Sequence, residues 1–189
     1  MARWQPDAPG RLAAAALDLF EEHGYENTTV IEIAERAGLT KSTFFRYFPD
    51  KREVLFGGGT VADLLVEGIT SAPPAAEPLD AVAEGLDALG RTFFTVERRE
   101  FSGRRQAVLN AHTELREREA LKRIDLTASM IEALNRRGVP GLTAHVAAKL
   151  GSLVWEIAYD RWIDTDNGED FGPLARQALA EVRAAGAVC

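Results

Sequence analysis

Apolar residues recur every three or four positions along almost the whole of this 189-residue chain, which is the spacing of one helix face. Ala, Leu, Glu and Arg dominate these stretches, and all four are good helix formers. No run of β-branched residues alternates in the way that predicts a strand. The pattern therefore predicts an all-α protein, with helices over 10–23, 29–37, 41–48, 50–68, 79–99, 101–112, 114–137, 142–164 and 171–185.

Charge and composition limit the functions that such a chain can have. Asp and Glu total 29 against 22 Lys and Arg, so the chain cannot coat nucleic acid through bulk positive charge, although local recognition of DNA stays open. The single cysteine, Cys189, is the last residue, and His23, His112 and His145 are far apart. These positions predict no catalytic thiol, no metal site and no cofactor. With neither a membrane span nor a signal peptide evident, we expect a cytoplasmic protein without a membrane partner.

Segment 29–51, TVIEIAERAGLTKSTFFRYFPDK, has the features of a helix-turn-helix. Thr28 or Thr29 can cap the first of two short helices and Thr40 the second, and Gly38 can adopt the left-handed turn between them. Phe44 would fill the core behind the second helix, and residues 41–52 hold four basic side chains and one acidic one. The alternative is a pair of core helices with a solvated basic face. The caps, the aromatic core and the local charge together favour DNA binding.

The exposed side of the second short helix can bond phosphates or base edges. Lys51 is placed as a phosphate contact, and Ile31 could touch a thymine methyl, although a buried or simply exposed Ile fits the sequence equally well. The residues predicted to contact DNA are Thr29, Ile31, Thr40, Lys41, Ser42, Thr43, Phe45, Arg46, Tyr47 and Lys51.

These residues resemble the DNA-binding domain of the tetracycline-repressor (TetR) family. The shared pattern is a Thr, then Ile-Ala, Ala-Gly-apolar-Ser/Thr, an aromatic cluster and a Lys, found here at Thr29, 33–34, 37–40, 44–48 and Lys51. Ser42 and Phe45 depart from it, since the family often has Gly and Tyr there. The resemblance implies a homodimer that binds a double-stranded, palindromic operator and is released from it by a small molecule.

The resemblance also implies two domains, a helix-turn-helix DNA-binding domain at 1–50 and a ligand-binding and dimerisation domain at 51–189. The second would be a bundle of about five to six helices. STFFRYFPDK at 42–51, with ELRERE at 114–119, is similar to a branch described as having an acyl-CoA-like ligand-binding domain.

Aromatic and Met side chains recur at helical spacing in the second domain. Each can be ordinary core or the wall of a cavity for an apolar, acyl or aromatic effector. The candidate ligand-binding residues are Phe93, Phe94, Phe101, His112, Met130, Trp155 and Tyr159. A basic cluster at Arg98, Arg99, Arg104 and Arg105 could meet a phosphate-bearing ligand, although the acids interspersed with it favour a solvated face.

Two features of the second domain can each be interpreted in two ways. The last two helices carry small residues that suit either packing within the chain or a homodimer interface. They are Ala147, Ala148, Gly151, Ser152, Ala158, Ala175 and Ala178, with Leu179 beside them. The triplet at 57–59, Gly-Gly-Gly, is either a hinge between the domains or a simple helix break.

The sequence thus predicts a ligand-responsive transcriptional regulator that represses its target. Two other classes remain as alternatives. A helical-bundle enzyme is disfavoured because the chain has no Walker loop, no nucleophile elbow and no cluster of metal ligands. A helical small-molecule-binding or adaptor protein without operator binding is disfavoured because Lys41, Arg46 and Lys51 keep their charge.

Overall fold

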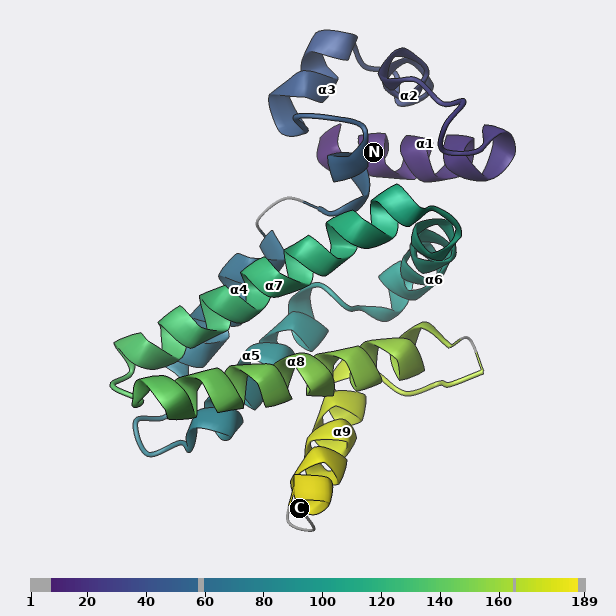
Figure 1. Ribbon diagram of the computed structural model, residues 1–189. Coiled ribbons are helices and arrows are strands. Elements are labelled where there is room, and N and C mark those ends of the chain that lie inside the picture. Colours follow the sequence, from purple (N-terminus) through teal and green to yellow (C-terminus); the bar gives the residue numbers. More distant parts are fainter. Residues whose placement is uncertain (1–7, 58–59, 165, 187–189) are drawn as a thin grey trace, which may run out of the picture. The chain divides into compact units, whose positions relative to one another are not determined.

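The computed structural model describes residues 8–57, 60–164 and 166–186, which form helices and no strand. In chain order the elements are α1 (Ala8–His23), α2 (Val30–Arg36), α3 (Lys41–Tyr47), the 3-10 helix η1 (Arg52–Leu55), α4 (Thr60–Ser71), α5 (Pro78–Thr92), α6 (Val96–Ala111), α7 (Thr113–Arg136), α8 (Gly141–Ile163) and α9 (Phe171–Gly186). The all-α prediction is confirmed, and α2 and α3, with seven residues each, are much shorter than α1 (Figure 1).

The chain forms two compact units that are not two continuous stretches of sequence. The first unit comprises the described residues of 1–59 together with 104–119, and the second unit comprises those of 60–103 and 120–189. Helices α6 and α7 contribute residues to both units. The division differs from the predicted boundary after residue 50, because Arg104, Arg105 and Arg118 bond partners in α1 and η1.

In the first unit α1 packs against α2, α3 and η1, and α2 packs against α3 (Figure 1). Leu12, Phe20, Ile33, Phe44 and Val54 form its core and are almost completely buried. Each of these helices presents one apolar face, and α2, α3 and η1 are too short to be stable alone in water, so they depend on the core that they share with α1.

The turns of the first unit depend on two glycines with positive φ. Gly24 (φ 81°) ends α1, and Gly38 (φ 65°), the predicted turn glycine, ends α2. After α2, the amides of Gly38 and Leu39 donate to the carbonyls of Glu35 (2.9 Å) and Ala34 (2.8 Å). This pattern satisfies the last carbonyls of α2 and turns the chain sharply into α3.

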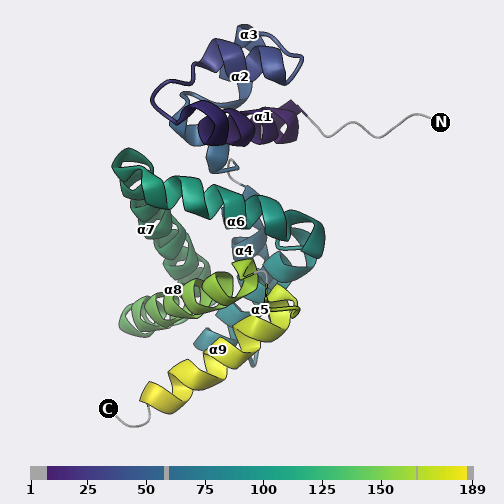
Figure 2. The same cartoon turned by 90° about the vertical axis from the view of Figure 1, so that its right-hand side faces the viewer.

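In the second unit α5 packs against α4, α8 and α9, and α8 packs against α9 (Figure 2). Glycines permit the close crossings. A Cβ at Gly68 of α4 would lie 2.6 Å from the Cα of Gly85 in α5, and a Cβ at Gly151 of α8 would lie 2.4 Å from Val82 Cγ1. Side chains at these positions would force the helices apart, so α4, α5 and α8 depend on Gly there.

Two predicted helices are interrupted. The helix expected over 79–99 ends at Thr92 and resumes at Val96, because Phe94 turns into the core and both Phe93 N and Phe94 N donate to Leu89 O. The helix expected over 50–68 is instead η1 and α4, and Gly57 between them has φ 68°. Gly58 and Gly59 lie outside the described residues, so the hinge stays a prediction.

The small residues of α8 and α9 pack within the chain. Ala147, Ala148 and Ala158 of α8 and Ala175 and Ala178 of α9 are all buried. Of the two uses predicted for them, intrachain packing accounts for their burial in this structure. A homodimer would therefore need a different face of these helices.

Candidate nucleic-acid interface

Helix α3 is held at its start by a local hydrogen-bond pattern. The Thr40 side chain is the N-cap and accepts from Thr43 N (3.1 Å), and the hydroxyls of Thr40 and Thr43 lie 2.9 Å apart. Arg46 Nη2 lies 3.5 Å from Thr43 Oγ1. Thr40 therefore fixes the helix, and Thr43 links that cap to the first basic side chain of the next turn.

Helix α2 begins with a capping box, in which Thr29 and Glu32 satisfy each other's groups. Glu32 N donates to Thr29 Oγ1 (3.3 Å), and Thr29 N donates to Glu32 Oε2 (2.8 Å). The hydrogen bonds from the Thr29 hydroxyl and then from its backbone N–H lower the pKa of Glu32 from its ordinary value. Thr29, predicted to contact DNA, thus has a structural role in the free protein.

The outward side of α3 combines cations with exposed aromatic rings. Phe44 is fully buried, and the neighbouring positions Lys41, Ser42, Phe45, Arg46 and Tyr47 are exposed. Lys41 Nζ lies 5.9 Å from the centroid of the Phe45 ring, and the Arg46 guanidinium carbon lies 5.5 Å from that of Tyr47. We call Lys41, Ser42, Thr43, Phe45, Arg46 and Tyr47 the α3 face.

Exposed apolar side chains extend this surface onto α2. Ile31 and Phe45 are each 48% exposed and Tyr47 is 43% exposed. Ile31 is thus not a core residue, which removes one of its predicted alternatives. Large apolar side chains beside cations suit contacts with thymine methyls, sugars and phosphates, so the α3 face and Ile31 together have the chemistry of a DNA-contacting surface.

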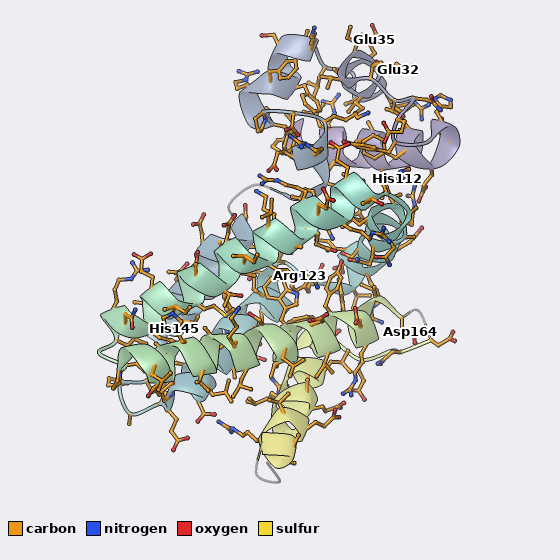
Figure 3. The ribbon with its side chains drawn as sticks, in the orientation of Figure 1. Glu32, Glu35, His112, Arg123, His145 and Asp164 are labelled. Atoms are coloured by element: carbon orange, nitrogen blue, oxygen red, sulfur yellow. The ribbon has the colours of Figure 1, made fainter. Side chains whose placement is uncertain are left out.

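Acidic groups limit where a phosphate backbone can approach. Glu32 and Glu35 both project from α2 (Figure 3), and both are exposed. Arg36, at the end of α2, pairs with Glu22 through two hydrogen bonds of 3.0 and 2.7 Å, and this bonding lowers the pKa of Glu22. The positive part of the surface therefore lies on α3 rather than on α2.

Lys51, predicted as a phosphate contact, forms hydrogen bonds within the protein itself. Its Nζ donates to the carbonyl oxygens of Tyr25 (2.6 Å) and Thr28 (3.0 Å) and lies 4.1 Å from the Tyr25 ring centroid. The ammonium group thereby ties the loop between α1 and α2 to the segment that follows α3. Burial, the largest effect, raises the pKa of Tyr25 well above its ordinary value. The phosphate contact stays a prediction.

Ion pairs attach residues 104–119 to the N-terminal helices. Arg104 bonds Asp18 (2.7 Å) and Glu21, which raises its pKa, and Arg118 pairs with the largely buried Glu53. Arg105 Nε donates to Leu55 O (2.6 Å). These bonds join α1 and η1 to the end of α6 and the beginning of α7.

His112 belongs to the first unit, where its ring centroid lies 5.5 Å from that of Tyr25 (Figure 3). The other predicted ligand-binding residues belong to the second unit. His112 therefore belongs to a different unit from these residues, because the α6–α7 turn that carries it is bonded to α1 and η1.

Four of the predicted ligand-binding residues meet in one aromatic cluster. The Phe94 ring lies at its centre, with ring centroids 5.3 Å from Phe93, 5.6 Å from Trp155 and 5.5 Å from Tyr159. Trp162 (5.3 Å) and Phe171 (4.6 Å), which are not among the predicted ligand-binding residues, complete the cluster. The sequence signal for Trp162 was its position three and seven residues after Tyr159 and Trp155, on the same helix face.

Met130 and Phe101 have simpler surroundings. Met130 is fully buried, and its sulfur would lie 3.6 Å from a Cβ built at Gly151. Phe101 is half-buried on α6.

Within the described residues no group of three or more His, Cys, Asp and Glu side chains could hold a metal ion. No described helix has the length and apolar character that crossing a membrane requires.

Comparison with known proteins agrees with this geometry. Residues 12–56 match the family model described as bacterial regulatory proteins, tetR family. The HTH-type transcriptional regulator TcmR of Streptomyces glaucescens is 40% identical over 83 residues, which is 43% of this chain and 37% of TcmR. The regulator HbdR of Aromatoleum sp. (strain CIB) is 39% identical over 46 residues, 24% of this chain and 20% of HbdR. The chain thus matches less than half the length of either relative.

The fold is similar to that of solved regulators over nearly the whole chain. FadR of Thermus thermophilus, described as a TetR-family transcriptional repressor in complex with lauroyl-CoA, has a TM-score of 0.55 and 24% identity, covering 92% of both chains. The SmeT–triclosan complex has a TM-score of 0.61 and 21% identity, covering 94% of this chain and 90% of SmeT. At these identities the likeness shows the fold.

A capped helix-turn-helix on a helical body defines the class of helical transcriptional regulators. Within that class, residues 12–56 match the tetR family model, and the fold of nearly the whole chain is similar to that of solved regulators.

Two lysine variants separate the structural role of Lys51 from surface charge. We expect Lys51→Met to lower the free energy of unfolding by about 1.5–3 kcal/mol, because two carbonyl oxygens lose a charged donor. Lys41→Met removes the same charge from the exposed α3 face, and should change stability by less than about 0.5 kcal/mol. Urea unfolding measures both. Equal stabilities of the two variants would show that the Lys51 bonds contribute nothing.

Proposed function

We propose that this protein is a ligand-responsive, DNA-binding transcriptional repressor that acts as a homodimer on a palindromic operator. The observation that carries this proposal is the α3 face, which presents Lys41, Arg46 and exposed aromatic rings while Phe44 anchors the helix from behind. A repressor of this kind acts where the DNA is, so we keep the predicted cytoplasmic location as part of the proposal.

In this proposal, α3 is the helix that enters the major groove of the DNA. Lys41, Ser42 and Thr43 occupy its first turn, which is the part of a recognition helix that reaches base edges. Arg46 and Tyr47 lie one turn further along, where they can bond phosphates. Because the cations on this face are few, two copies of it are needed for tight binding, with half-sites about one helical turn (~34 Å) apart.

Salt dependence measures the phosphate contacts. On DNA from the region flanking the protein's own gene, we expect Arg46→Gln to weaken binding and to reduce the slope of log affinity against log salt by about 1 per site. Arg91→Gln is the control, because Arg91 is an exposed cation of α5 paired with Asp87 in the second unit. Fluorescence anisotropy over a KCl series gives the slopes. An unchanged slope for Arg46→Gln would remove Arg46 from the interface.

The homodimer interface is proposed on the outer face of α8. Leu142, Val146 and Leu153 are exposed there. They lie within about 40° of one another around a helix of 3.6 residues per turn. Since the small residues of α8 and α9 are buried within the chain, this apolar stripe is a face of α8 that is available to a second copy.

A charge in this stripe should separate the subunits. We expect Leu153→Glu to be a monomer in sedimentation velocity under conditions where the wild type is a dimer, because pairing would bury two carboxylates. Val96→Glu places the same charge at an exposed valine of α6 and should stay dimeric. A dimeric Leu153→Glu would show that the interface lies elsewhere.

The effector site is proposed in the second unit, around the Phe94 aromatic cluster. Rings that pack edge to face, with Phe93, Trp155 and Tyr159 only half-buried, suit an apolar, acyl or aromatic molecule. Bound lauroyl-CoA in FadR and triclosan in the SmeT complex support this class of ligand. Helices α6 and α7 contribute residues to both units. They therefore connect the unit proposed to bind the effector with the unit proposed to bind DNA.

A helical ligand-binding protein without operator binding is the second candidate, ahead of an enzyme. The regulators among the relatives favour the DNA-binding function. A gel shift on the flanking DNA distinguishes the candidates, because only the repressor gives a specific complex that unrelated DNA does not compete away.

A further inference from the structure

Two buried nitrogen donors in the second unit have no acceptor within the described part of the chain. They are Nε of Arg99 and Nε1 of Trp162. Trp162 is 0% exposed, so its indole N–H has no access to bulk water. Buried N–H groups are nearly always paired, with protein, ordered water or a ligand. Two such groups together therefore indicate a site for an oxygen acceptor.

The two donors belong to one structural cluster. The guanidinium carbon of Arg99 lies 5.7 Å from the centroid of the Trp162 ring. Trp162 itself contacts Phe94 and Phe171, with ring centroids 5.3 and 6.2 Å away. The unpaired donors thus lie at the edge of the aromatic cluster proposed to receive the effector.

Arg99 holds the loop between α8 and α9 with its other nitrogens. Nη1 donates to Asn167 O (2.6 Å), and Nη2 donates to Glu169 O. This loop begins at Asp164, at the end of α8 (Figure 3). Within the described residues, the half-buried guanidinium is therefore bonded by neutral backbone carbonyls and not by a carboxylate.

The charge and the donors together define the chemistry of the missing partner. A carboxylate carries one negative charge, and its two oxygens can each accept a hydrogen bond. Hydrogen bonds between a guanidinium and a carboxylate are stronger than those to a neutral carbonyl, so Arg99 Nε favours a carboxylate over a neutral acceptor. A neutral oxygen would pair the donors but leave the positive charge uncompensated beside aromatic rings.

We propose that Arg99 and Trp162 bind the carboxylate of a small apolar acid, whose hydrocarbon part lies against the Phe94 cluster. This inference rests on the proposed effector site and adds the chemical class of the effector. The rings of Phe94 and Trp155 supply the apolar contact, and the Arg99 guanidinium and the Trp162 indole supply the polar one. Arg99 Nε and Trp162 Nε1 would donate to the carboxylate, while Nη1 and Nη2 keep their bonds to the loop carbonyls of Asn167 and Glu169.

The Trp162 indole N–H is a direct probe of this site. In protein labelled with ¹⁵N-tryptophan, Trp→Phe variants assign the indole signals. We expect decanoate or phenylacetate to shift the Trp162 signal saturably, because its N–H gains an acceptor. The matched alcohols, decanol and phenylethanol, lack the charge and should bind at least about tenfold more weakly.

Arginine variants test the other donor. Arg99→Gln should weaken binding of the acid about tenfold or more, and Arg99→Lys, which keeps the charge but loses Nε, should fall between it and the wild type. Arg91→Gln, which removes a cation paired with Asp87, should bind as the wild type does. Thermal unfolding of each variant confirms that it is folded.

Failure of the inference can be told apart from failure of the proposed function by measuring operator binding in the same samples. If neither acid shifts the Trp162 signal, or if Arg99→Gln binds them as well as the wild type, the donors are paired by water and the inference is wrong. If an alcohol releases DNA while neither acid moves the Trp162 signal, the repressor function stands and the acid site is wrong. An acid that binds at Trp162 but leaves DNA bound would support the site and contradict ligand-responsive repression.

Discussion

The left-handed turn at Gly38 is the constraint on which the DNA-binding unit depends. Its φ of 65° allows the amides of Gly38 and Leu39 to close α2, and Arg11 fastens the same turn by bonding Ala37 O. A Cβ at Gly38 would lie 2.8 Å from Arg11 Nη2. Because this turn sets the direction of α3, it determines that Phe44 points into the core and that Lys41 and Arg46 face outward.

A second constraint comes from far along the chain. Arg104 and Arg118 pair with acids of α1 and η1, so the DNA-binding unit is completed by residues 104–119. In the Glu53–Arg118 pair the Glu53 side chain is largely buried, and loss of Arg118 would leave its charge uncompensated. The unit that would contact DNA therefore includes parts of α6 and α7, the helices that continue into the second unit.

Features with local causes could be predicted from the sequence. Thr29 and Thr40 cap helices through neighbours three residues away, and Gly38 and Gly24 act through their own backbone. Features with distant causes could not be predicted. The break at Phe94 arises because the core draws that ring inward, and the bonding of Arg104 to Asp18 joins residues 86 positions apart.

The site residues divide in the same way. Exposure of the α3 face follows from helical periodicity, so Lys41, Phe45 and Arg46 could be identified from the sequence. Lys51 could not be understood from sequence alone, because its carbonyl partners lie in the loop after α1. A core residue and a cavity wall share the same apolar pattern, so the sequence could not separate Phe94 from its half-buried neighbours or single out Trp162.

The central claim is that the α3 face reads DNA sequence as part of a two-fold assembly. Selection of bound sequences from a pool of random DNA, with the wild type and with Thr43→Ala, tests it most directly. The wild type should enrich an inverted repeat with half-sites about one helical turn apart, and Thr43→Ala should change the bases preferred within each half-site. No enriched repeat, or the same base preference from both proteins, would contradict the claim.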